Sequence, residues 1–209
     1  MAAARWRGHV SPSRLKCLER QWRKLSELGE PGWRYLRGDD VSDDTLERFL
    51  ALEHAGWKGA EGSSLRSDPR QEAFFLRMTT AFRADGDLFF TELLLDGQAI
   101  ASSCNPRSGS DGFAFKVAFD PRSAKYGPGL LNELAFLKAL EQGVDQFRFI
   151  DSGAAPGSFI EELWPDRVPL YSGSIALGRI SRAAARAADA LARTRRRMLV
   201  GPAGRAATA

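Results

Sequence analysis

The sequence predicts a mixed α/β fold of the α+β class, with helices on both faces of a largely antiparallel sheet. Three observations favour it. Apolar residues recur at helical spacing in the first part of the chain. Short apolar runs joined by turn residues then follow, which is typical of strands connected as hairpins. A further long apolar helix and another strand come next, so helices and hairpins are expected to share one layered domain.

Three helices are predicted in the first part of the chain. The first runs from Ser11 to Leu28, and its serine is suited to cap the free backbone amides of the first turn. The second runs from Asp40 to His54 with Ser42 as its cap, and the third from Asp68 to Arg83. Between the last two, the segment GWKGAEGSS carries three glycines and is predicted to break regular structure.

The strands are predicted around one strong hairpin signal. Asp96-Gly97 is a preferred two-residue turn, and it joins Leu88–Leu95 to Gln98–Asn105. The other predicted strands are Trp33–Arg37, Phe113–Asp120, Phe147–Ile150 and Leu170–Leu177. An apolar helix follows Ser123, and a short helix covers Ser158–Trp164.

Composition limits the classes of function. The chain has 209 residues, of which 44% are hydrophobic, and a formal net charge of +4. The positive charge is concentrated after residue 178, where eight arginines face one aspartate, so the preceding body is slightly acidic. We therefore predict a disordered N-terminus over residues 1–10, one domain over 11–178 and a basic Ala/Arg-rich helix and tail over 179–209.

The cysteine and histidine content argues against disulfides and metal. Cys17 and Cys104 lie far apart, and with only two histidines the sequence predicts no metal site. Cys104 is expected to be a small core residue. No apolar run is long enough to span a bilayer, and the first residues lack the apolar core of a signal peptide. The expected localisation is cytoplasmic.

The segment SAKYGPGLLNELAFLKALEQG raises the question of an anion site. A helix that begins after a glycine-rich turn presents free backbone N–H groups, and these together with the helix dipole favour an anion. Gly127 and Gly129 carry no side chains, so a phosphate could approach the backbone there. The pattern is neither a Walker loop nor a dinucleotide fingerprint, and a simple tight connection explains it equally well on physical grounds.

The order of elements resembles the GNAT acyltransferase fold. In that superfamily the turn carries Gln/Arg-x-x-Gly-x-Gly/Ala, and Ala124-Lys125-Tyr126-Gly127-Pro128-Gly129 is similar to it at both glycines but has Ala124 at the polar first position. Four segments more closely resemble the C-terminal GNAT-like domain of CelD/BcsL-type proteins of cellulose and exopolysaccharide biosynthesis: Ser11–Gly29, Leu52–Gly62, Phe115–Leu131 and Ile150–Arg167. Members of that family usually carry another GNAT-like half before this region.

The resemblance implies an acyl-CoA-dependent N- or O-acyltransferase that acts on a sugar, an amino sugar or another small-molecule acceptor. Acetyl-CoA or another acyl-CoA is then the co-substrate. Its pyrophosphate would lie on the backbone of Tyr126, Gly127, Gly129 and Leu130. The backbone around Val117 and Phe119 would position the thioester.

Candidate acceptor-side residues lie where the second predicted helix gives way to the glycine-rich segment. Glu53 could act as a general base, and Trp57 could stack on a sugar-like acceptor beside Lys58. A structural tryptophan at a capped helix end is the alternative for this pair.

Two candidates lie on the later strands. Lys116 stands in an apolar strand and needs a partner, for which Asp151 or Glu92 is expected. It could orient the acceptor or stabilise the thioester oxyanion, whereas a solvent-facing edge lysine is the alternative. Asp151 could deprotonate the acceptor and Ser152 could bind it, because both follow a strand that ends at the expected cleft. No tyrosine in Ser158–Trp164 supplies the general acid, and Trp164 is expected to be core.

Two other functions remain open at this point. The chain could be a degenerate GNAT half that packs against a second copy or a partner half. It could also be an aminoacyl-tRNA-dependent transferase of the peptidoglycan-bridge type, although nucleic acid is not the expected partner. The C-terminal basic helix allows weak contact with an anionic membrane surface.

Overall fold

The computed structural model describes residues 8, 10–155, 157–164, 166–170, 178, 183 and 187. Two compact units are distinguished, Met1–Asp166 and Arg167–Ala209, and the helices and strands with described bounds all belong to the first. The predicted N-terminal disorder, the strand Leu170–Leu177 and the basic tail fall largely or wholly outside the described residues. Within the described part, no helix combines the length and apolar composition that a membrane crossing requires.

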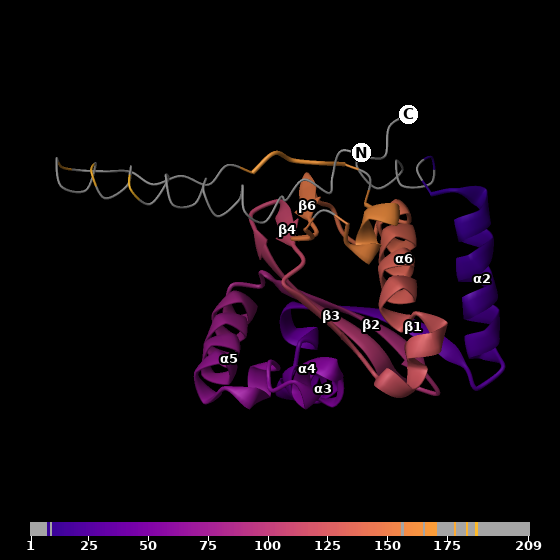
Figure 1. Cartoon of the computed structure of the whole chain (residues 1–209), viewed down its shortest axis with the longest axis horizontal. Coiled ribbons are helices and arrows are strands. Elements are labelled where there is room, and N and C mark those ends of the chain that lie inside the picture. The colour runs from indigo at the N-terminus through magenta and orange to yellow at the C-terminus, as the bar shows by residue number, and fades with distance from the viewer. Residues whose placement is uncertain are drawn as a thin grey trace. The chain divides into compact units, whose positions relative to one another are not determined.

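A six-stranded sheet forms the centre of the first unit (Figure 1). Its path runs β1-β2-β3-β4-β6, and β5 pairs with β3 beside that path. Every pairing is antiparallel except the parallel one between β4 and β6. The strands are β1 (Pro31–Arg37), β2 (Leu88–Leu95), β3 (Gln98–Ser108), β4 (Asp111–Phe113), β5 (Lys116–Phe119) and β6 (Phe149–Asp151).

Helices cover both faces of the sheet, as predicted (Figure 1). They are α2 (Pro12–Ser26), α3 (Asp43–Ala55), α4 (Trp57–Ala60), α5 (Pro69–Ala84) and α6 (Pro128–Glu141). Ser11 caps α2 by accepting from the Arg14 amide, and Ser42 forms a capping box with Thr45 at the start of α3. Three short 3₁₀ helices precede α3, α5 and α6, at Gly38–Asp40, Leu65–Ser67 and Pro121–Tyr126, and a fourth covers Phe159–Glu162.

Two hydrophobic clusters hold the layers together, one on each face. On one face, leucines of α2 and α6 pack on β2 and β3, and Trp164, which was expected to be core, packs partly buried against this cluster. On the other face, α3 and α5 pack around Phe49, which stacks on Phe75 with ring centroids 5.4 Å apart. Cys104 is fully buried in this second cluster, which confirms its predicted core position.

The strand predicted over Phe113–Asp120 is interrupted. It forms β4 and β5, and the residues between them make a bulge in which Phe115 and Lys116 both lie opposite Cys104. The interruption arises because β6 pairs with β4 and its last residue accepts a hydrogen bond from the Ala114 amide, 2.8 Å away. The strand is therefore divided by β6, which is distant in sequence, and the local pattern of residues does not predict this division.

The glycine-rich segment after α3 is also more ordered than predicted, because it contains the short helix α4. Gly59 makes this possible. A Cβ atom at this position would lie 1.7 Å from the His54 carbonyl oxygen, so only glycine allows the chain to fold back so closely on α3. The same backfolding brings the Lys58 side chain to the end of α3.

Candidate active site at the open edge of β5

Among the strands that the structure describes, none pairs with the outer edge of β5. The Asp120 amide donates to the Ile100 carbonyl at 2.8 Å, in the register that places Phe119 opposite Ala101. Backbone groups along an antiparallel strand alternate in direction, so Val117 and Phe119 turn their N–H and C=O groups away from β3. Among the described strands, β5 pairs only with β3, which leaves these groups available to an extended ligand.

The start of α6 lies against the same strand. Gly127 is the N-cap residue, with a left-handed φ of 63°, and it provides no side-chain cap. The first-turn amides of Gly129 and Leu130 therefore lack the usual capping acceptor, and the positive end of the helix dipole lies there. An ideal Cβ at Gly129 would lie 3.8 Å from both Val117 and Phe119. The uncapped turn and the unpaired edge of β5 thus form one continuous surface.

The two glycines of this turn have packing roles that the sequence did not indicate. The space beside Gly129 is bordered by β5, so this glycine permits close helix–strand approach. The space beside Gly127 is bordered by the side chain of Gln21 from α2, whose Nε2 would lie 3.3 Å from a Cβ atom. Tyr126 is buried under Lys125, whose ammonium lies 5.0 Å from its ring centroid.

Replacing Gly127 with alanine is expected to lower the free energy of unfolding by about 1–2 kcal/mol. Two causes add, the left-handed backbone and the contact with Gln21. Gly62→Ala is the matched control, because Gly62 has a similar φ of 69° but nothing within 4 Å of its Cβ position. Urea unfolding of both variants measures the difference. Equal losses would contradict the packing role of Gln21.

A second cluster lies on the opposite face of β5, around Glu53 at the end of α3. Its Oε1 accepts from the Lys116 ammonium at 2.7 Å, and its Oε2 accepts from the Leu65 amide at 2.8 Å. The Lys58 ammonium lies 3.7 Å from the same Oε1, and the Glu53 side chain is 1% exposed. The structure thus brings together three predicted site residues, Glu53, Lys58 and Lys116.

The prediction that Asp151 or Glu92 is the partner of Lys116 is wrong. Glu92 lies between Arg34 and Arg48, with its Oε2 accepting from Arg34 Nε at 2.7 Å and its Oε1 accepting from Arg48 Nε at 3.2 Å. Asp151 is also engaged elsewhere. The actual partner, Glu53, is 63 residues away along the chain and comes close through the packing of α3 on β5. Lys116 is therefore a tightly paired lysine rather than a free edge residue.

Lys58 is the less well neutralised of the two lysines. Its pKa is lowered, mainly by burial and then by the charge of Lys116, while Glu53 opposes the shift. Its ammonium lies 5.9 Å from the centroid of the Trp57 ring, and Trp57 itself is 61% exposed. The predicted Trp57–Lys58 pair therefore presents an open aromatic face beside a partly buried cation.

Asp151 is the last residue of β6, and Ser152 begins the turn that follows it. Asp151 Oδ1 accepts from the Gly153 amide at 2.8 Å, and Ser152 Oγ accepts from the Ala154 amide at 3.3 Å. The other carboxylate oxygen of Asp151 has no hydrogen-bond donor among the described residues. These two candidates lie next to the interruption between β4 and β5, because the backbone of Asp151 binds Ala114 there.

Glu133 is a titratable residue that sequence reasoning missed. It is 4% exposed on α6, and its carboxylate accepts from Ser103 Oγ at 3.1 Å. Burial raises its pKa to about 7, and contacts with Ser103 and Trp164 partly oppose this shift. The sequence signal for this buried polar pair was Asn132-Glu133 inside an otherwise apolar helix. Asn132 is also buried, and it hydrogen-bonds Trp33 and Thr91.

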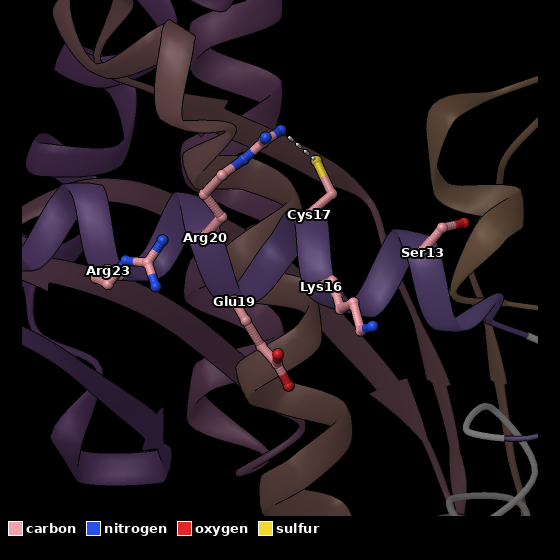
Figure 2. A pocket seen from close by; sticks show the side chains of 6 residues that line it. All are labelled: Ser13, Lys16, Cys17, Glu19, Arg20 and Arg23. Carbon is pink, nitrogen blue, oxygen red and sulfur yellow. Dashed lines mark hydrogen bonds between the residues drawn. The ribbon is translucent and has the colours of Figure 1, made fainter.

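A shallow hollow lies apart from these groups, on the exposed side of α2 (Figure 2). It is lined by Ser13, Lys16, Cys17, Glu19, Arg20 and Arg23. In Figure 2, the Arg20 guanidinium points to the Cys17 thiol, 3.8 Å away. None of the predicted site residues belongs to it. Among the described residues, no group of three or more His, Cys, Asp or Glu side chains is arranged to hold a metal ion.

Residues 12–164 match the family described as Acetyltransferase (GNAT) domain. The chain therefore belongs to this family, and it is an acyltransferase of the GNAT type. No curated protein matches the chain in a sequence comparison.

Three solved structures illustrate the similarity. The ribosomal-protein-S18-alanine N-acetyltransferase of Escherichia coli has 12% identity and a TM-score of 0.35, over 54% of this chain and 61% of that one. The aminoglycoside 6'-N-acetyltransferase AAC(6')-Ih of Acinetobacter baumannii has 16% identity and a TM-score of 0.42, over 69% and 99%. The PaiA N-acetyltransferase of Thermoplasma acidophilum, in complex with coenzyme A, has 14% identity and a TM-score of 0.34, over 54% and 74%. The family match, and not these similarities, carries the assignment.

Proposed function

We propose that the chain transfers an acyl group from acetyl-CoA or another acyl-CoA to the nitrogen or oxygen of a small-molecule acceptor of the sugar or amino-sugar class. The observation that carries the proposal is that two adjoining surfaces present backbone groups without hydrogen-bond partners among the described residues. The uncapped start of α6 suits a pyrophosphate, and the unpaired edge of β5 suits the extended amide-containing arm of coenzyme A.

Each predicted co-substrate residue has a part in this arrangement. The amides of Gly129 and Leu130 would hold the pyrophosphate. Tyr126 and Gly127 would shape the turn before them, because the Gly127 amide already donates to the Ala124 carbonyl and Pro128 has no amide hydrogen. The outward backbone groups of Val117 and Phe119 would bind the arm and position the thioester. The acceptor would approach across Trp57 and Lys58, with Lys116 near the thioester oxygen and Ser152 beside the acceptor.

The chemical step is direct transfer. The acceptor nitrogen or oxygen attacks the thioester carbonyl carbon, the carbon–sulfur bond breaks, and coenzyme A leaves as its thiol or thiolate. Asp151 would take the acceptor proton through its free carboxylate oxygen. Glu53 is less suited to that role, because two ammonium groups and one amide already occupy its oxygens. We assign it to positioning Lys116 and Lys58.

The resemblance to CelD/BcsL-type proteins supports a cytoplasmic role in exopolysaccharide or cellulose biosynthesis. Pairing with a second copy or with a partner GNAT half belongs to the same proposal. A nucleic-acid partner and a membrane contact through the basic C-terminal segment are secondary to it.

The proposed function is tested by thiol release from acetyl-CoA. We expect release to depend on an added amino sugar such as glucosamine. Asp151→Asn should lower the acceptor-dependent rate by about 100-fold, because the acceptor proton then has no base. Asp85→Asn is the matched control, since Asp85 is exposed at the end of α5. Thiol release that does not increase when the amino sugar is added would contradict the mechanism. An equal loss of the acceptor-dependent rate in both variants would also contradict it.

A further inference from the structure

Two lysines share one carboxylate on the face of β5 that packs against α3. Lys116 is the close partner of Glu53 at 2.7 Å, whereas Lys58 lies at 3.7 Å. Both lysine side chains are about three-quarters buried, with exposed fractions of 23% and 26%. The local charge of the cluster is therefore +1, and its uncompensated part lies mainly on Lys58. A partly buried cation without a full partner is costly, because burial removes water from it without supplying an anion.

Neighbouring charges do not compensate Lys58. Among the described residues, Glu53 stabilises its charged form and Lys116 acts against it. Glu61, three residues along the chain, is exposed and forms no ion pair with Lys58 among the described residues. Glu47 and Glu72, farther along the chain, both pair with Arg66. The adjacent histidine, His54, bonds Ser64 through Nδ1 at 2.8 Å. The surplus charge therefore remains available to a ligand.

The side chain next to Lys58 is a large exposed aromatic. Trp57 is 61% exposed, so much of its indole ring is accessible to a ligand. Its ring lies within cation–π range of Lys58, at 5.9 Å from the ammonium. A ring-shaped ligand that stacks on Trp57 would thus hold its substituents beside Lys58.

We propose that Trp57 and Lys58 form an acceptor subsite for an anionic sugar, in which the sugar ring stacks on Trp57 and a carboxylate or phosphate group pairs with Lys58. This inference rests on the proposed function and names the acceptor class of the same site. It also excludes a class, because a polycationic acceptor such as an aminoglycoside would place further positive charge against the two lysines.

Direct binding of matched probes tests the subsite. Glucosamine, glucosamine 6-phosphate and 2-amino-2-deoxyglucuronic acid share one ring and differ in the anionic group, and kanamycin is the polycationic comparison. In calorimetric titrations of the whole chain, one or both anionic sugars should bind about tenfold tighter than glucosamine, which corresponds to about 1.4 kcal/mol. The stronger of the two identifies phosphate or carboxylate as the group recognised. Kanamycin should bind most weakly.

The variants separate charge recognition from general damage. Lys58→Gln should abolish the preference for the anionic sugars, and Lys58→Arg should retain part of it. Lys16→Gln, an exposed lysine on α2, should leave it unchanged. Anionic sugars that bind no tighter than glucosamine, a preference that survives in Lys58→Gln, or tightest binding of kanamycin would each overturn the inference. A parallel acetyl-CoA titration keeps the two proposals distinct, because the co-substrate should bind Lys58→Gln as it binds the wild type.

Discussion

Glu53→Gln is expected to lower the free energy of unfolding by about 2–3 kcal/mol, somewhat less than for a fully buried ion pair because the lysines keep some contact with water. The substitution leaves Lys116 and Lys58 without their shared anion in a partly buried position. The two ammonium groups then repel each other. The Leu65 amide keeps an acceptor in the glutamine oxygen, so the loss reports mainly on charge.

Urea unfolding measures this effect, with Glu19→Gln on α2 as the control. Glu19 is exposed, so its variant should stay within about 0.5 kcal/mol of the wild type. A second variant adds a sharper test: Lys116→Met in the Glu53→Gln background should recover part of the lost stability, because it removes one of the two unpaired cations. Glu53→Gln with wild-type stability would show that the cluster is not an ion-pair network.

The second large effect is a pH dependence of stability that arises from Glu133. Its pKa is about 7 in the folded chain, raised by burial from an ordinary value of 4.5. The folded state therefore binds more protons than the unfolded state between these two values. The contribution of Glu133 to stability should be greatest below pH 4.5 and should fall as the pH rises toward 7. Above pH 7 it should no longer change with pH. The full loss is about 3 kcal/mol.

Glu133→Gln isolates this contribution from other titrating groups. A glutamine oxygen can still accept from Ser103, and the side chain carries no charge to desolvate. The variant should match the wild type near pH 4.5 and become the more stable of the two near pH 8. The measurement is the difference in unfolding free energy between the two proteins across this range. A difference that does not change with pH would contradict the buried, raised-pKa carboxyl.

Local signals in the sequence predicted most of the helices and the central hairpin. Ser42 caps α3 as its position suggested, and Asp96-Gly97 makes the turn between β2 and β3 with positive φ at both residues. The glycine-rich turn before α6 was likewise recognisable. These features depend on residues within a few positions of one another, which is the range in which capping and turn chemistry act.

The features that the sequence could not predict depend on contacts between distant segments. The break between β4 and β5 requires β6, which follows only after α6. The pairing of Lys116 with Glu53 requires α3 to pack across β5, and no spacing rule connects them. Glu133 could be noticed as a charged residue in an apolar helix, but its burial against Ser103 depends on how α6 lies on the sheet.

The central claim is that the uncapped start of α6 holds the pyrophosphate of acyl-CoA. Ala124 offers a direct test, because it precedes the turn and its side chain is exposed. Its backbone oxygen accepts from the Gly127 amide, and a substitution of the side chain leaves that hydrogen bond in place. The measurement is a calorimetric titration of acetyl-CoA with the wild type, Ala124→Glu and Ala124→Arg. We expect binding by the wild type, affinity at least about tenfold weaker in Ala124→Glu, and equal or tighter affinity in Ala124→Arg. No binding by the wild type even at millimolar acetyl-CoA, or the same affinity in all three proteins, would contradict it.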